Sequence, residues 1–279
     1  MNIIELGPDI YLKPEDLVPV LKGNVKVKLT DEAQIAISAG RDFMERFMNQ
    51  SSSPVYGINT GFGALCNVEV SDDQLAELQT NLVRSHACGM GDEVEPSLVR
   101  MMMVLKIQGL SYGNSGVRLS TVNQLVDMVN ADILPLVYES GSLGASGDLA
   151  PLAHIALAMM GEGRIRKGSK LMDAAEALSL NGLKPLILSA KEGLALLNGT
   201  QFMSAFLTAG VIHAARLSYQ ADLLAAYSLE AFDGRVEAFD EAVHKVRPHQ
   251  GQLLTAKRIR EFVADSPRMH RAKKHVQDP

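Results

Sequence analysis

One stretch of the sequence decides the fold class. Residues 200–232 read TQFMSAFLTAGVIHAARLSYQADLLAAYSLEAF and contain no proline. Alanine and leucine are frequent in this stretch, and a helical pattern longer than about 25 residues is typical of bundles, coiled coils and helical repeats. Because the chain shows no internal repeat, we expect one long helix of a bundle.

Shorter helical patterns lie on both sides of this stretch. They cover residues 30–49, 71–86, 96–105, 118–132, 148–160 and 251–265. Residues 25–29 alternate in polarity, which is typical of a strand, whereas residues 162–187 read as short, loop-like pieces. We therefore predict a mainly α protein. A small N-terminal α(+β) domain covers residues 1–110, and residues 111–279 form the first part of a central bundle of long helices that is incomplete at its C-terminus.

Composition excludes several classes of protein. The 279 residues carry a formal net charge of −5, and 47% of them are hydrophobic, which is typical of a globular chain. The mild acidity and the absence of tryptophan argue against a nucleic-acid partner. The two cysteines, Cys66 and Cys88, exclude a disulfide scaffold. The charged N-terminus and the lack of an apolar run of about 18 residues predict a cytoplasmic protein with no membrane partner.

The strongest local anomaly is the segment 141–148, which reads GSLGASGD. It is not a nucleophile elbow, because Gly147 directly follows Ser146. It is not a phosphate-binding loop either, because no Gly-Lys-Ser/Thr follows. Two interpretations remain: a tight turn before a helix that Asp148 caps, or a segment that reacts with itself.

In the second interpretation the backbone closes into a ring. Gly147 has no side chain, so its nitrogen can reach the carbonyl of Ala145, and the hydroxyl of Ser146 can leave as water. Loss of two waters gives a 4-methylidene-imidazol-5-one, an electrophile made without a bound cofactor. Strain from the surrounding fold must drive the closure. An ordinary serine nucleophile of a hydrolase would instead be labelled by acylating reagents, which a ring could not be.

Residues 145–154 (ASGDLAPLAH) resemble the signature of the aromatic amino-acid ammonia-lyases, a family that carries this ring. Four further segments are similar to motifs of the family in the same order: 56–63 (YGINTGFG, its Tyr-loop), 81–86 (NLVRSH), 196–201 (LLNGTQ) and 276–279 (VQDP). The resemblance runs from about residue 5 to the last residue. The Tyr-loop then belongs to the N-terminal domain, and the Ala-Ser-Gly segment to the bundle.

The resemblance implies a catalytic role for four residues. Ala145, Ser146 and Gly147 form the ring autocatalytically, so neither a metal nor a nucleotide is expected as cofactor. Tyr56 takes the β-proton of an amino-acid substrate or holds the network that does. A phenol with a pKa of about 10 is a weak base at neutral pH, so Tyr56 needs a neighbour that stabilises its anion.

The resemblance also implies three substrate-binding residues. His86 lies by the substrate side chain, Asn198 hydrogen-bonds the ring or the substrate amine, and Gln277 sits near the ring and the substrate. In the family, histidine at the position of His86 accompanies histidine or tyrosine substrates. The expected reaction converts L-histidine to urocanate and ammonia, and a tyrosine or phenylalanine ammonia-lyase or aminomutase is the alternative.

The chain departs from the family's pattern in its length. Family members are much longer and form homotetramers whose active sites combine residues from three subunits. This chain stops just before the tyrosine of the Gln-Asp-Pro-Tyr-Ser motif, and the arginine that pairs with the substrate carboxylate is absent. We expect an N-terminal portion that works in a homo-oligomer with the missing half. An inactive piece that acts only in assembly is the alternative from another class.

Taken singly, several residues have plainer interpretations. Tyr56 is typical of a loop anchor, and His86 with Cys88 supplies two metal ligands but no third. His154 fits a packed, hydrogen-bonded core histidine. The run Met101–Met103 fits the filling of a core.

Overall fold

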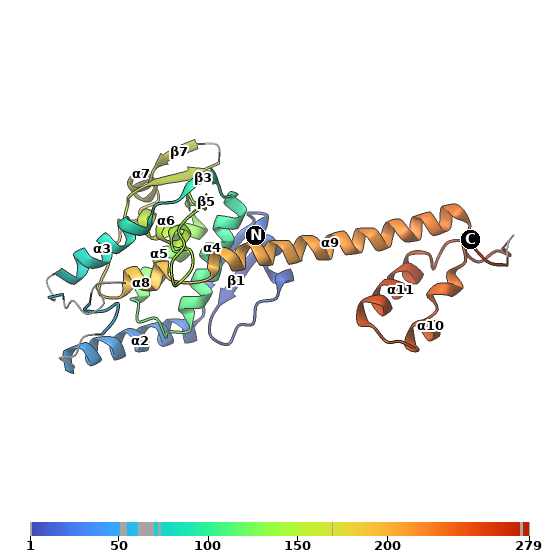
Figure 1. Ribbon diagram of the computed structural model, residues 1–279, viewed down its shortest axis with the longest axis horizontal. Helices are drawn as coiled ribbons and strands as arrows, with labels where there is room; N and C mark the ends of the chain where they lie inside the picture. Colours follow the sequence, from blue (N-terminus) through green and yellow to red (C-terminus); the bar gives the residue numbers. More distant parts are fainter. Residues whose placement is uncertain are drawn as a thin grey trace. The chain divides into compact units, whose positions relative to one another are not determined.

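The chain divides into two compact units, which we describe separately. The computed structural model describes residues 2–50, 55–60, 70–71, 74–168, 170–273 and 276–278. The first unit is Met1–Ala209 and the second is Gly210–Pro279. Helix α9 (Gln201–Phe232) begins in the first unit and continues into the second (Figure 1). The long helix expected from the sequence is therefore confirmed.

Helices make up most of the first unit, as the sequence predicts. They are α1 (Val18–Leu21), α2 (Asp31–Gln50), α3 (Leu75–His86), α4 (Pro96–Ser111), α5 (Leu119–Asn130), α6 (Ala150–Met159), α7 (Ala174–Leu180) and α8 (Glu192–Leu197). Helix α4 is the core of the unit, since residues all around it are buried, including Met101, Met102 and Met103. A helix that is apolar on every side is stable only inside a protein.

Short strands of the first unit pair with one another in small sheets. β1 (Asn2–Leu6) pairs in parallel with β2 (Val25–Leu29), and β3 (Met90–Glu93) pairs antiparallel with β5 (Tyr138–Ser140). β4 (Leu134–Pro135), β6 (Arg164–Lys167) and β7 (Lys170–Asp173) form the third sheet. The mainly α fold with a small β contribution is as predicted.

The prediction that residues 162–187 are loop-like is wrong. They contain the β6–β7 hairpin and helix α7. The strands are four residues long, which is the lower limit at which alternating polarity indicates a strand. Ile165 anchors β6 in the core with no exposed surface. The turn passes through Gly168, whose φ of +60° favours glycine.

The domain boundary expected near residue 110 falls inside the first unit. Residue 110 lies near the end of α4, which contacts α1 and α2 on one side in sequence and α5 and β4 on the other. Helix α4 therefore packs against elements on both sides of the expected boundary.

In its described residues, the second unit contains the rest of α9 and three further elements. These are the 3-10 helix η4 (Val236–Phe239), α10 (Glu241–Lys245) and α11 (Gln250–Phe262). Its core consists of Ala226, Ile259, Val263 and Met269. Many large apolar side chains of α9 stay exposed within this unit. They are Val211, Leu217, Tyr219, Leu223, Leu224, Tyr227 and Phe232.

The expectation that no stretch is long and apolar enough to cross a membrane is wrong. By length and composition, the stretch Glu192–Phe232 is long and apolar enough to cross a membrane, and 22% of its apolar segment is buried. Two of the helices described above, α8 and α9, lie in this stretch. Length and composition do not distinguish a membrane span from a helix that packs against other helices of a protein.

Candidate functional site

Three helices that adjoin predicted site residues pack against one another. Helices α3, α6 and α8 are in mutual contact. His86 is the last residue of α3, and Asn198 directly follows α8. The segment 145–147 lies shortly before α6. The fold thus gathers the elements of three motifs that are far apart in the sequence.

Ala145 and Ser146 form the tip of a turn that two hydrogen bonds close. Gly144 N donates to Gly147 O at 3.2 Å, and Gly147 N donates to Gly144 O at 3.1 Å. Gly147 has a φ of +79°, which favours glycine, and all three residues of 145–147 are exposed. Because the Gly147 N–H is bonded to Gly144, it must leave that partner before it can attack the carbonyl of Ala145.

Asp148 holds the base of this turn. Its Oδ1 accepts hydrogen bonds from Ser142 N at 2.9 Å and from Ala150 N at 3.0 Å. A Cβ on Gly141 would lie 2.1 Å from the same carboxylate, so only glycine fits there. The sequence indicates Asp148 as a helix cap, and the bond to Ala150 N at the start of α6 agrees. The bond to Ser142 N, which joins the two ends of the turn, is not predictable from the sequence.

His86 is tied to the end of its own helix. Its Nδ1 lies 2.9 Å from Leu82 O, and the ring is half-buried. The chain then runs into β3, where Met90 pairs with Ser140. Ser140 directly precedes the segment 141–148, so the strand pairing joins the two motifs.

His154 adds a second connection between these motifs. Its Nε2 accepts a hydrogen bond from Gly89 N at 3.0 Å, and its ring packs edge-on against Tyr138 with centroids 5.3 Å apart. A Cβ on Gly89 would lie 2.9 Å from Nε2, so glycine is required. Burial lowers the pKa of His154, which favours the neutral ring that can accept this bond. The predicted packed core histidine is confirmed.

The His154 contact predicts a pH-dependent stability. The folded protein binds the His154 proton less tightly than the unfolded chain, so the stabilisation is complete above the unfolded pKa of 6.5 and is lost as pH falls below it. His154→Gln keeps an acceptor but does not titrate. We expect the free energy of unfolding of the wild type to decrease more than that of the variant between about pH 8 and pH 5. Equal losses in urea unfolding would contradict this role.

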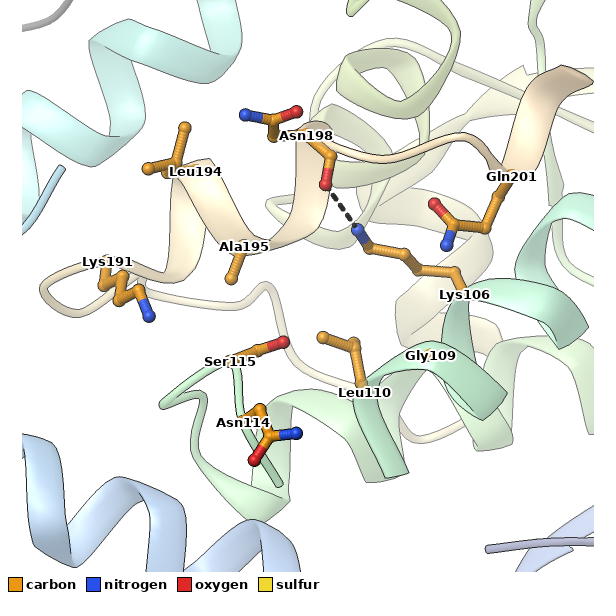
Figure 2. A pocket seen from close by; sticks show the side chains of 10 residues that line it. All are labelled: Lys106, Gly109, Leu110, Asn114, Ser115, Lys191, Leu194, Ala195, Asn198 and Gln201. Carbon is orange, nitrogen blue, oxygen red and sulfur yellow. Dashed lines mark hydrogen bonds between the residues drawn. The ribbon is translucent and has the colours of Figure 1, made fainter. Parts of the chain in front are cut away.

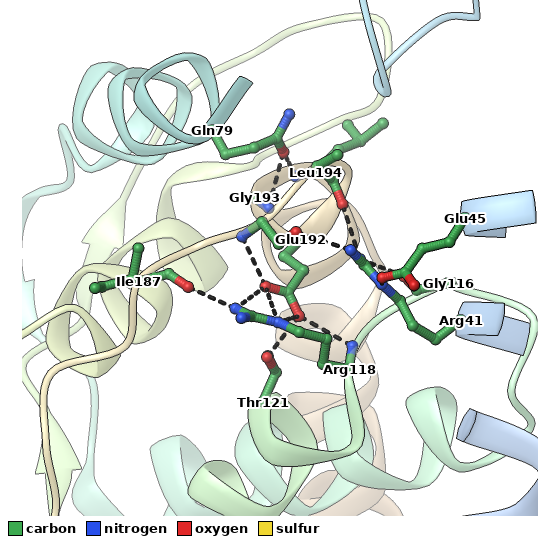
Figure 3. Close-up of polar contacts among 12 residues, drawn as sticks. Arg41, Glu45, Gln79, Gly116, Arg118, Thr121, Ile187, Glu192, Gly193 and Leu194 are labelled. Atoms are coloured by element: carbon green, nitrogen blue, oxygen red, sulfur yellow. Dashed lines mark hydrogen bonds and ion pairs between the residues drawn. The ribbon is translucent and has the colours of Figure 1, made fainter. Parts of the chain in front are cut away.

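A buried carboxylate fixes the start of α8. Glu192 has no exposed surface, and its two oxygens accept hydrogen bonds from Arg118, Thr121 and Ser189 (Figure 3). Burial alone raises the pKa of Glu192, but these hydrogen bonds outweigh it, and the pKa lies below its ordinary value. The spacing Ser189-x-x-Glu192 matches a capping box, and the bond from Ser189 N to Glu192 is half of that pattern.

Two further contacts hold α8 in place (Figure 3). The amide oxygen of Gln79 in α3 accepts from Gly193 N at 2.9 Å. The guanidinium of Arg41 in α2 donates to Ala190 O and Gly116 O, each at 3.2 Å. Helix α8, and with it Asn198, is therefore positioned by polar contacts from α2, α3 and the start of α5.

Tyr56 lies in a segment near the opposite end of α3. Its neighbour Ile58 packs in one cluster with Leu75, the first residue of α3, and with Ala190. His86 ends the same helix, about 17 Å away along its axis at 1.5 Å per residue. Tyr56 is 54% exposed. The rest of the predicted Tyr-loop, residues 61–63, lies outside the described residues.

Gln277 belongs to the second unit. Its side chain is exposed, and the neighbouring Asp278 accepts a hydrogen bond from Arg235 N at 2.6 Å. Pro279, the last residue of the predicted VQDP motif, lies outside the described residues, as does Cys66. Among the described residues, no group of three or more His, Cys, Asp and Glu side chains could hold a metal ion.

Comparison with known proteins defines the family. A sequence profile of the family described as aromatic amino acid lyase matches residues 12–279. The chain is 42% identical over 278 residues to histidine ammonia-lyase 2 of Fusobacterium nucleatum, covering 99% of this chain and 54% of that protein. This chain belongs to the aromatic amino acid lyase family.

Solved structures agree with this assignment. Histidine ammonia-lyase from Trypanosoma cruzi superposes with a TM-score of 0.84 at 39% identity, covering 93% of this chain and 50% of that one. Phenylalanine aminomutase of Pantoea agglomerans superposes with a TM-score of 0.87 at 34% identity, covering 96% and 51%. The chain therefore spans about half the length of the relatives it matches.

Proposed function

We propose that this chain is the N-terminal portion of a histidine ammonia-lyase, a carbon-nitrogen lyase that converts L-histidine to urocanate and ammonia. The observation that carries the proposal is the packing of α3, α6 and α8, which gathers His86, the segment 145–147 and the Asn198 loop on adjoining elements. The identity to curated histidine ammonia-lyases supports the choice of substrate.

The segment 145–147 fits the ring that this family uses. In closing, Gly147 N bonds to the carbonyl carbon of Ala145, whose oxygen leaves as water, and Ser146 loses its hydroxyl and α-hydrogen as a second water. The exposed turn leaves room for this change, and a Cβ added at Gly147 would meet no atom within 4 Å. When formed, the ring supplies an electrophile that makes the substrate amine a better leaving group.

The chain's own residues then divide the remaining work. Tyr56 accepts the β-proton of the substrate or holds the network that does, and His86 lies by the substrate side chain. Asn198 hydrogen-bonds the ring or the substrate amine, and Gln277 sits near the ring and the substrate. Elimination of ammonia without an enzyme is slow, so these contacts and the ring together must lower the barrier by about 10 kcal/mol or more.

A homo-oligomer, with the tetramer as the expected form, completes this site. Tyr56 lies near the end of α3 that is opposite to His86, so a second copy of the chain is needed to bring a tyrosine to the ring. The exposed apolar side chains of α9 offer a surface for such an assembly. We propose a cytoplasmic enzyme whose C-terminal half resembles that of its relatives, with no membrane or nucleic-acid partner.

The substrate is tested by offering histidine, tyrosine and phenylalanine to the complete enzyme. Formation of urocanate from histidine, with little turnover of the other two amino acids, is the expected result. Because the aminomutase of Pantoea agglomerans has a very similar structure, the products must also be examined for β-amino acids. Turnover of tyrosine or phenylalanine without turnover of histidine would overturn the substrate assignment.

A further inference from the structure

A cavity of about 290 Å³ lies between α4 and α8, beside residues 114 and 115. Figure 2 shows Lys106 and Gln201 on one side of it, and Lys191, Asn114 and Ser115 on the other. The amide of Asn198 points away from Lys106 in this view, so only the backbone of Asn198 faces the lysine. Asn198 therefore belongs both to this cavity and to the proposed substrate site, whereas Tyr56, His86 and Gln277 do not line the cavity.

Lys106 lacks a counter-charge in this cavity. The residue is 4% exposed, and its Nζ donates to Asn198 O at 3.4 Å. Among the described residues that line the cavity there are two lysines and no acidic residue. Burial lowers the pKa of Lys106 to about 8, so the group still carries a proton at neutral pH. A buried charge without a partner is costly, and an anion in the cavity would offset that cost.

Gln201 supplies a second, independent feature of a binding site. Its Oε1 is buried and has no hydrogen-bond partner, which is rare in folded proteins because such an atom costs free energy. Its Oε1 lies 2.1 Å from where a Cβ on Gly199 would be, and its Nε2 lies 3.3 Å from where a Cβ on Gly109 would be. We therefore expect a ligand in this cavity to carry a hydrogen-bond donor for Gln201 Oε1, such as a hydroxyl or an amino group, close to its anionic group.

We propose that this cavity binds a carboxylate, with the carboxylate on Lys106 and a neighbouring hydroxyl or amino group on Gln201. Leu110 and Ala195 line the same cavity and suit a short apolar chain. The carboxylate comes either from a small free hydroxy or amino acid or from a side chain of another stretch of polypeptide. Both sources present the same group to Lys106.

The first test titrates lactate and acetate into the 279-residue chain and follows binding by calorimetry. Both should bind saturably, lactate more tightly because its hydroxyl reaches Gln201. Lys106→Met should weaken both by about tenfold or more, which corresponds to the loss of one charged hydrogen bond. Binding should also weaken as pH rises above about 8, where Lys106 loses its proton. Lys191 is the other charged residue that lines the cavity.

Gln201→Leu is the matched variant that keeps the fold if Lys106→Met does not. Replacing a buried atom that has no partner should cost little stability. This variant should bind acetate as the wild type does and should lose the preference for lactate. Equal effects of lactate, acetate and chloride on the wild type, unchanged in both variants, would overturn the proposal.

The second test distinguishes the two sources. In a chimera, the C-terminal half of the Fusobacterium nucleatum relative follows residue 279. If a side chain of that half fills the cavity, the chimera should no longer bind lactate, and NMR of dimethylated lysines should give Lys106 a pKa above its ordinary value. If the ligand is a free acid, lactate binding should persist. A chimera that binds no lactate and keeps the lowered pKa of Lys106 contradicts both sources.

Discussion

Ser146→Ala is expected to abolish turnover of histidine by the complete enzyme. Alanine has no hydroxyl to lose, so the exocyclic double bond of the electrophile cannot form. Because the ring supplies much of the roughly 10 kcal/mol by which the barrier is lowered, the rate should fall by on the order of 10³-fold or more. The assay follows urocanate formation, and intact mass should show that the loss of two waters no longer occurs.

The neighbouring serine of the same segment provides the control. Ser142 contributes its backbone N–H to Asp148, and Ser142→Ala keeps that bond. This variant should retain both the ring and the activity. Neither substitution should change the free energy of unfolding by more than about 0.5 kcal/mol, because both lie on an exposed or half-exposed turn. An active Ser146→Ala enzyme would contradict the proposed function.

Glu192→Gln should have the largest effect on stability. The substitution removes the negative charge from a buried site where Arg118 donates through its side chain and its backbone. Removing one partner of a fully buried ion pair costs about 3–5 kcal/mol, but the Arg118 side chain is 37% exposed and stays partly hydrated when its partner is lost. The free energy of unfolding, measured in urea, should therefore fall by about 1–3 kcal/mol, the cost of leaving buried hydrogen-bonding groups unsatisfied. Asn198, which directly follows α8, should also be held less firmly in place.

Glu162→Gln is the matched control for this variant. Glu162 also forms a bidentate pair, with Arg84, but the Arg84 and Glu162 side chains are 53% and 37% exposed, whereas Glu192 is fully buried. An exposed pair contributes about 0–1 kcal/mol, so this variant should unfold almost as the wild type does. Similar losses in the two variants would show that the burial of Glu192 does not matter.

The Glu192 contacts also predict a dependence on pH. The pKa of Glu192 is lowered in the folded state, so the stabilisation is present above the ordinary value of 4.5 and is lost as pH falls below it. The variant Glu192→Gln should lack this part of the acid sensitivity.

Local patterns predict the helices well but do not predict their partners. The long helix α9 and the buried methionines of α4 follow from residue types within one stretch of sequence. The capping box at Ser189 indicates that Glu192 begins a helix. Its main partner, Arg118, is 74 residues away in sequence. A local sequence pattern cannot predict a contact between residues so far apart. The β6–β7 hairpin is local in sequence, and it is missed for another reason, because each of its strands is only four residues long.

Sequence motifs indicate some residues of the candidate site, and the fold is needed for others. The segment 145–147, His86 and Asn198 all come from quoted motifs, whereas the role of His154 in bonding Gly89 needs the fold. The sequence around Lys106 also points to a site. It is a single charged residue within MMMVLKIQGL, an otherwise uncharged run of α4. A lone lysine in a buried helix predicts a partner anion.

The intact mass of the purified, active enzyme tests the central claim most directly. The proposed function predicts a polypeptide lighter than its sequence by two water molecules, with the loss mapped by peptide fragmentation to residues 145–147. An enzyme that eliminates ammonia from histidine while its mass equals that of the unmodified sequence would contradict the account.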